Sequence, residues 1–120
     1  MSWHFDETRP IFQQIAEQVT IDIVSGKYQP GGKLPSVREY AVEAGVNPNT
    51  MQKALSALEE SGLIVTQRNS GRTVTEDTAL INKLRKNTAR DAAAKYLDFI
   101  TSAGLSVEDA IEIIREVGKL

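Results

Sequence analysis

The chain has 120 residues, 41% of them hydrophobic and none of them cysteine, so it can bury one modest core and excludes disulfides and thiolate zinc sites. The net charge of −2 argues mildly against a polyanionic ligand, but residues 26–75 hold six basic and only four acidic side chains. The N-terminal segment lacks the basic stretch and long apolar run of a secretory signal, and no apolar run reaches eighteen residues. We expect a soluble, cytoplasmic protein.

The first thirty-five residues predict an arm, a helix and a loop. Trp3 and Phe5 alternate with polar residues, which is typical of either a short half-buried strand or an anchored arm. A helix is predicted between Pro10 and Gly26, because apolar residues recur there at helical spacing: Phe12, Ile15, Ala16, Val19 and Ile23. Residues 27–35 contain two prolines and two glycines and are expected to form an ordered loop.

Two short helices follow, separated by about three residues. Ser36 and Glu39 have the spacing of a capping box and predict a helix that ends near Gly45. Asn47 and Pro48 supply a cap and a first-turn proline for the next helix. That helix carries an apolar face opposite a polar one and closes at residues 61–62; its apolar residues are Met51, Ala54, Leu55 and Leu58. The close spacing predicts a helix-turn-helix.

The remainder predicts a hairpin and two further helices. Residues 63–68 and 72–75 are rich in β-branched side chains and flank a turn at 69–71, so we expect a hairpin directly after the third helix. From about Asp77 the pattern becomes helical until Gly104 interrupts it. Ser106 can cap a last amphipathic helix. The predicted fold is mainly α with a small β-hairpin wing (α+β), divided into a winged helix-turn-helix over residues 1–75 and a helical tail over 76–120.

The polar side of the third helix has the chemistry of a base-reading surface. In a helix-turn-helix the second helix lies in the major groove, where amides read adenine and cations read guanine or bind phosphate. Helix N-termini and flanking arginines add phosphate contacts. The residues predicted to contact DNA on these grounds are Ser36, Arg38, Asn47, Asn49, Thr50, Gln52, Lys53, Arg68 and Arg72. Each of these residues alone is more often part of a solvated face, and the prediction depends on their combination in order.

Many separated motifs together resemble one family. They are PIFQQI at residues 10–15, Gly26 with PG at 30–31, LPSVRE at 34–39, VNPNT at 46–50, AL at 54–55, LE at 58–59 and GLI at 62–64. Residues 10 to about 75 are similar to a GntR-type DNA-binding domain, and VNPNT with a short two-helix tail resembles its YtrA subfamily. The resemblance implies DNA contacts from Arg38, the start of the recognition helix and the wing around Gly71. It also implies control of an ABC-transporter or envelope-stress operon.

Two positions depart from the wider family. Many members carry arginine where Pro48 and Gln52 stand, so their base preferences do not transfer to this chain. The wing sequence at residues 70–73 lacks one of the two glycines that usually flank a variable residue, which leaves the geometry of the wing tip open.

The tail predicts a homodimer. About forty-five residues are too few to enclose a sizeable ligand pocket, but two helices can bury apolar stripes against a second copy. The expected seam comprises Leu80, Leu84, Tyr96, Phe99, Ile111, Ile114 and Val117. The alternative is that the tail folds back onto its own winged domain. A two-fold dimer would bind an inverted-repeat operator, and repression by blocking a promoter is the simplest consequence.

We expect no enzyme activity, cofactor or metal. His4 is the only histidine, and the acidic residues lie at the spacings of solvated helix faces without catalytic partners. The predicted partners are double-stranded operator DNA and a second copy, without a membrane, and any small-molecule effector is left open. The rival function is a winged-helix module that binds proteins and not DNA.

Overall fold

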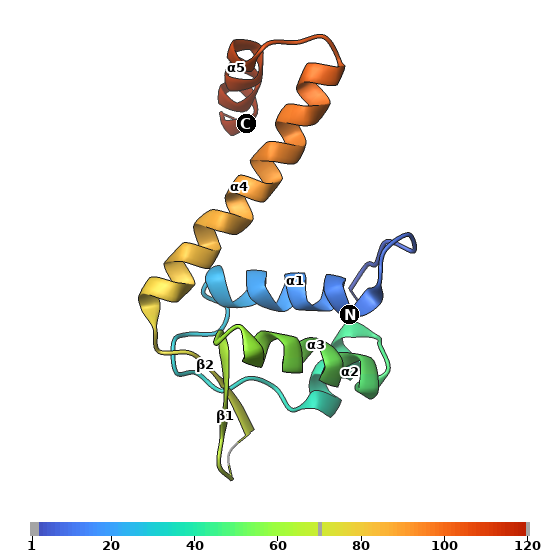
Figure 1. Cartoon of the computed structure of the whole chain (residues 1–120), viewed down its shortest axis with the longest axis vertical. Helices are drawn as coiled ribbons and strands as arrows, with labels where there is room; N and C mark the ends of the chain where they lie inside the picture. The colour runs from blue at the N-terminus through green and yellow to red at the C-terminus, as the bar shows by residue number, and fades with distance from the viewer. Residues whose placement is uncertain (1–2, 70, 120) are drawn as a thin grey trace. The chain divides into compact units, whose positions relative to one another are not determined.

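A computed structural model of the chain describes residues 3–69 and 71–119; the expectations at Ser70 and at residues 1–2 and 120 lie outside the described residues. The described part consists of helices and one hairpin, as predicted (Figure 1). The elements are α1 (Ile11–Val24), α2 (Val37–Ala44), α3 (Pro48–Glu60), β1 (Ile64–Gln67), β2 (Gly71–Val74), α4 (Thr78–Ser102) and α5 (Val107–Gly118). The chain divides into two compact units, Met1–Arg85 and Lys86–Leu120, which are described separately.

The helix starts confirm the predicted caps. The Ser36 hydroxyl accepts a hydrogen bond from the Glu39 amide, and the Glu39 carboxylate accepts one from the Ser36 amide, each at 3.1 Å. The Asn47 side chain accepts from the Asn49 amide at 2.7 Å, with Pro48 as the first residue of α3. Ser106 and Asp109 form the same reciprocal box at the start of α5. Each cap satisfies amides that the first helical turn leaves unpaired, so these sequences fix where the helices begin.

The core of the first unit lies between α1 and α3. Ile15, Val19 and Ile23 of α1 are buried against the apolar side of α3, and α2 closes the cluster with Tyr40. The start of α4 also belongs to this core, because Ile81 is buried in it. Figure 1 shows α1 lying along α3, with α2 beside them. The buried side of α3 matches the predicted apolar face: Met51, Ala54, Leu55 and Leu58.

The loop before α2 pairs with the hairpin, which the sequence patterns did not predict. β1 and β2 pair antiparallel, with Ile64 opposite Val74 and Gln67 opposite Gly71. The loop before α2 joins this sheet through an isolated bridge between Lys33 and Thr73. The Leu34 amide also donates to the Arg72 carbonyl at 3.0 Å. The predicted ordered loop is thus held along the hairpin by backbone hydrogen bonds, which positions the entry to α2.

Residues 3–10, the described part of the N-terminal segment, form an anchored arm and no strand, which decides between the two predicted alternatives. The Trp3 ring packs edge-on against Tyr40, with 5.6 Å between the ring centroids. The Gln14 side chain binds the Asp6 backbone twice, at 2.7 and 2.6 Å. Aromatic packing and these paired hydrogen bonds hold the arm against α1 and α2.

A buried carboxylate ties α1 to α2. Asp22 is only 6% exposed and accepts hydrogen bonds from the Tyr40 hydroxyl and the Gln18 amide, both at 3.0 Å. The ammonium of Lys27 lies 3.9 Å from the same carboxylate. Burial, with the adjacent Asp22 charge, raises the pKa of the Tyr40 hydroxyl, which therefore stays a donor. Asp22 is satisfied by these neighbours, as a buried charge must be.

The second unit contains the end of α4 and all of α5. Ile100 and Ala110 are buried within it, and the Tyr96 hydroxyl donates to the Ala110 carbonyl at 2.9 Å. Several large apolar side chains of this unit stay exposed: Phe99, Leu105, Val107, Ile111, Ile114 and Val117. None of the helices within residues 3–69 and 71–119 is long and apolar enough to cross a membrane.

The burial difference between two valines predicts a difference in stability. Val19 is fully buried, whereas Val42 on α2 is 81% exposed. We expect Val19→Ala to lower the free energy of unfolding by about 2 kcal/mol, because it removes buried apolar groups and leaves a cavity. The matched change Val42→Ala should cost less than about 0.5 kcal/mol. Urea denaturation measures both, and equal losses would contradict the packing described above.

Candidate nucleic-acid interface

The side of α3 that faces away from the core is polar and open. Asn47, Asn49, Gln52 and Lys53 are exposed, and Thr50 is half-buried. The Gln52 amide donates to the Ser56 hydroxyl at 3.2 Å, one turn further along the helix. We call the residues Asn47, Asn49, Thr50, Gln52 and Lys53 the α3 surface. This surface presents amide and hydroxyl groups that can both donate and accept hydrogen bonds. Groups of this kind can form hydrogen bonds with the edges of bases.

Lys53 is held beside α1. Its ammonium lies 4.0 Å from the centroid of the Phe12 ring, within cation–π range. Phe12 is half-buried and packs against the core, so the ring is itself fixed. The charge of Lys53 is thereby placed where α1 borders the α3 surface.

Ser36 and Arg38 differ in how available they are. The Ser36 hydroxyl caps α2 through the Glu39 amide. Arg38 is exposed and forms no ion pair with another described residue. Ser36 can contact a phosphate only alongside its capping bond, whereas the Arg38 guanidinium is free to bind one.

The two arginines of the hairpin also differ. Arg68 is exposed near the turn. Arg72 is paired with the Glu59 carboxylate at the end of α3, and only 17% of its side chain is exposed. This ion pair directs Arg72 toward α3. A DNA contact by Arg72 stays a prediction, and it requires the guanidinium to bind DNA while paired with Glu59 or after leaving it. The pair also holds the hairpin against α3.

Near the turn the backbone adopts left-handed conformations. Asn69 has a φ of 68° and Gly71 a φ of 80°. A Cβ on Gly71 would meet no neighbour, so glycine is favoured there by the backbone angle and not by crowding.

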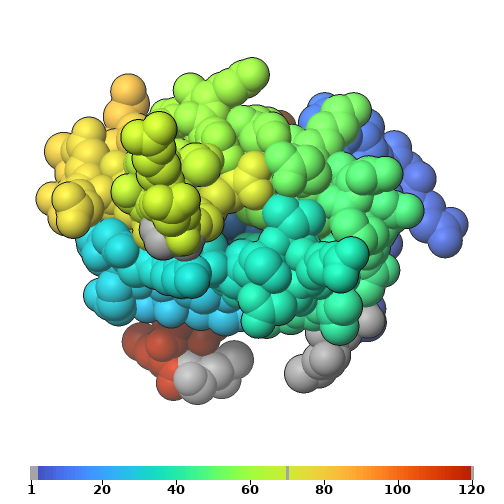
Figure 2. Space-filling view, turned by 90° about the horizontal axis from the view of Figure 1, so that it is seen from below, coloured from blue at the N-terminus to red at the C-terminus, as the bar shows by residue number. Residues whose placement is uncertain are grey.

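A groove of about 420 Å³ lies between the hairpin and the start of α2. Its lining includes Lys33, Ser36 and Val37 on one side and Thr66, Asn69 and Arg72 on the other. Figure 2 shows the hairpin beside the segment that leads into α2. The α2 entry and the wing thus border one continuous face of the first unit.

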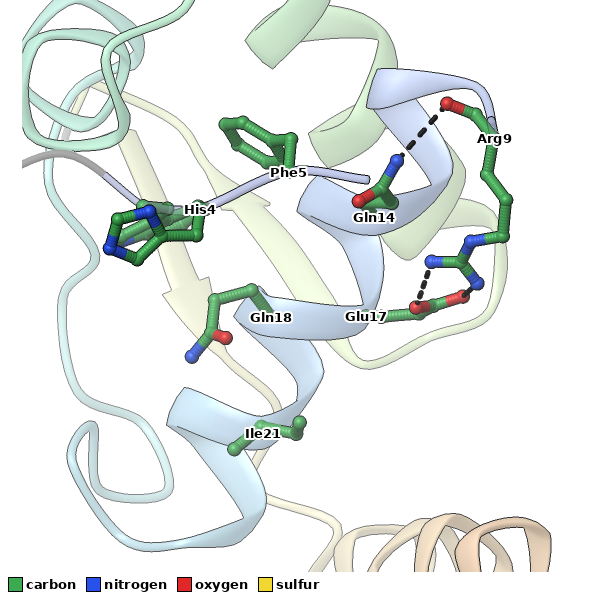
Figure 3. Close-up of a pocket in the computed structure, with 8 residues that line it drawn as sticks. His4, Phe5, Arg9, Gln14, Glu17, Gln18 and Ile21 are labelled. Carbon is green, nitrogen blue, oxygen red and sulfur yellow. Dashed lines mark hydrogen bonds and ion pairs between the residues drawn. The ribbon is translucent and has the colours of Figure 1, made fainter. Parts of the chain in front are cut away.

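A different hollow, of about 500 Å³, lies between the N-terminal arm and α1 (Figure 3). Its polar groups are largely paired with one another. The Arg9 guanidinium binds Glu17 at 2.8 and 3.1 Å, and Gln14 donates to the Arg9 carbonyl at 3.0 Å. None of its lining residues comes from α2, α3 or the hairpin. We therefore place the candidate DNA surface elsewhere in this unit.

Comparison with known proteins decides the family. Residues 11–74 match the family model described as bacterial regulatory proteins, gntR family. The chain belongs to the GntR family. This match spans α1 to β2 and confirms the winged helix-turn-helix, followed here by a helical C-terminal part.

Individual relatives agree with this membership. The HTH-type transcriptional repressor YtrA of Bacillus subtilis is 37% identical over 109 residues, covering 90% of this chain and 84% of YtrA. A GntR family regulator from Listeria monocytogenes has 37% identity and a TM-score of 0.83, covering 97% of this chain and 99% of that one. The AraR DNA-binding domain, solved in complex with operator ORX1, has 28% identity and a TM-score of 0.54 over 62% of this chain and 92% of that domain. This GntR protein is a DNA-binding transcriptional regulator and not an enzyme.

Two features of the interface were missed by sequence reasoning. The Glu59–Arg72 ion pair joins residues thirteen positions apart on different elements. Glu59 is half-buried and comes directly after the buried Leu58. From the sequence, its position on the helix predicts only a carboxylate in water. The bridge between Lys33 and Thr73 likewise lacks any local signal, because residues 27–35 contain no strand-like alternation.

The Glu59–Arg72 pair predicts a pH dependence of stability. The hydrogen bond from Arg72 lowers the pKa of the Glu59 carboxyl. A lowered pKa in the folded state contributes stability that is present above the unfolded pKa and is lost as pH falls through the folded one. The stability difference between the native protein and Glu59→Gln should therefore shrink between pH 6 and pH 3.

Urea unfolding at several pH values measures this difference. Glu60→Gln is the matched control, because Glu60 is exposed and forms no ion pair with another described residue. Its difference from the native protein should stay small throughout this range. A Glu59→Gln difference that does not change with pH would contradict the assigned pair.

Proposed function

We propose that the chain is a repressor that binds an inverted-repeat operator as a homodimer. The observation that carries this proposal is the exposed polar side of α3, which the core holds facing outward; Arg38 of α2 is exposed as well. The similarity to the repressor YtrA supports repression over activation. Occupancy of a promoter by the dimer is the simplest way for such a protein to repress.

The proposed DNA contacts fall into two groups. Asn49, Thr50 and Gln52 face the bases, because they lie on the first turns of α3 and carry groups that can read base edges. Phosphate contacts come from the residues that flank them: Ser36, Arg38, Asn47, Lys53, Arg68, Gly71 and Arg72. Such contacts position a protein on the duplex, while base contacts select the sequence.

The dimer is proposed from the apolar side chains of the second unit. Phe99 is 70% exposed and Ile114 is 56% exposed, although both are large and apolar. Ile111 and Val117 are exposed as well, at helical spacing on α5. Exposed large apolar side chains that recur on one helix often mark an interface, so a second copy is the proposed occupant.

The other predicted seam residues contribute less to this surface. Leu84 packs against the core of the first unit, and Leu80 is half-buried there. Tyr96 is half-buried, with its hydroxyl bound to Ala110. Their part in the seam stays a prediction, as do a cytoplasmic location and the control of a transporter or envelope-stress operon.

The DNA proposal is tested by Arg38→Ala. We expect affinity for an operator selected from a random pool to fall about 10- to 100-fold, because a free cation at the interface is lost. Thermal unfolding should be unchanged, since Arg38 is exposed. Lys83→Ala, which removes an exposed cation on α4, serves as the control. Full operator affinity of Arg38→Ala would reject the proposed contact.

The dimer proposal is tested by Ile114→Asp. A charge at this position should prevent apolar burial between copies and leave a folded monomer at micromolar concentration. Sedimentation equilibrium measures the mass directly. Arg115→Asp introduces the same side chain at the next exposed position of α5, and it should remain dimeric. A native protein that sediments as a monomer would contradict the proposal.

A further inference from the structure

An apolar hollow of about 460 Å³ lies at the turn between α2 and α3. Its lining residues are Arg38, Ala41, Val42, Gly45, Val46 and Pro48. Val42 is 81% exposed, more than any other exposed large hydrophobic residue described. A single guanidinium therefore borders a surface that is otherwise apolar and in contact with water, at the point where the recognition helix begins.

The local sequence places these groups together. Arg38 and Val42 are four residues apart on α2, so they share a face of that helix. Gly45 ends α2 in a left-handed conformation, with a φ of 75°, and turns the chain so that Val46 and Pro48 follow within the same hollow. Pro48 is exposed as the first residue of α3 and has no N–H to donate. The start of α3 thus carries the apolar ring of Pro48 at a position where a group that binds phosphate or a base is expected.

The chemistry of the major groove limits what such a surface can meet. In unmodified DNA the C5 methyl of thymine is the apolar group that the base edges present there, and the other edges carry hydrogen-bonding groups. Pressing Val42 and Pro48 onto a polar edge would remove water from groups that neither side chain can satisfy. Contact with a methyl group instead buries apolar surface on both partners.

We propose that the hollow formed by Val42, Val46 and Pro48 receives a thymine methyl group. Each operator half-site then carries one required T·A pair opposite the start of α3, and Arg38 binds the phosphate that flanks this pair. The inference rests on the proposed binding of operator DNA by the α3 surface, and it assigns specificity to apolar residues beside the polar ones. The hollow adjoins that surface along the chain, because Pro48 of its lining stands between Asn47 and Asn49 of the α3 surface.

Uracil substitution tests the proposal with the full chain. After an operator has been selected from a random pool, each thymine is replaced in turn by deoxyuridine, which removes only the methyl group. Fluorescence anisotropy at one fixed salt concentration gives the dissociation constants. We expect one thymine in each half-site to cost about three- to tenfold in affinity, and the others less than about twofold. At that position cytosine should bind weakly, and 5-methylcytosine should recover part of the loss.

Protein variants assign the methyl group to the hollow. Val42→Ala and Pro48→Ala should each weaken binding to the thymine duplex and become less sensitive to deoxyuridine at the critical position. Ile21→Ala removes an exposed apolar side chain from α1, outside the hollow, and should keep the full sensitivity. Circular dichroism and urea unfolding establish that all three variants are folded.

The outcomes separate this inference from the proposed function. An operator whose deoxyuridine substitutions all bind as tightly as thymine would overturn the inference and leave operator binding intact. A critical thymine whose penalty is unchanged in Val42→Ala and Pro48→Ala would also overturn it, because the methyl group would then lie elsewhere. Failure to select any sequence would overturn both proposals.

Discussion

The two-sidedness of α3 is the constraint on which the rest of the structure depends. Its apolar side is buried against α1, and that contact fixes which side chains remain in water. A helix that could roll about its axis would present no constant set of groups to DNA. Burial of Leu55 and Met51 is thus the physical cause of the exposure of Asn49 and Gln52.

The neighbours of α3 restrict it further at both ends. At the start, the left-handed Gly45 and the Asn47 cap set the turn from α2 within a few residues. At the end, the Glu59–Arg72 pair fastens the hairpin to the helix. The backbone bonds between residues 31–34 and β2 then connect the hairpin to the entry of α2. Together these contacts link the helix, the turn and the wing to one another, so the three elements keep one arrangement.

Local chemistry made the element order predictable. Capping boxes, first-turn proline and apolar periodicity act over three or four residues, and the positions of Ser36, Asn47 and Ser106 therefore predicted helix starts correctly. Contacts between distant segments leave no such pattern. The burial of Asp22 beside Tyr40 and the pairing of Arg72 with Glu59 follow from three-dimensional packing, and composition gave no sign of them. Of the candidate site, the polar face of α3 was predictable, whereas the apolar hollow beside it required coordinates.

The central claim is that the outward side of α3 lies against bases, and the side-chain amide resonances of the protein test it most directly. In ¹⁵N-labelled protein, addition of operator duplex should shift and broaden the amide signals of Asn49 and Gln52 well beyond the effect of random duplex at equal salt. The side-chain amide of Gln18 donates to Asp22, and the side-chain oxygen of Asn82 accepts from Arg85, both within the first unit. The NH₂ signals of these two residues should be unaffected. Unchanged α3 signals in a protein that still binds its operator would contradict the account.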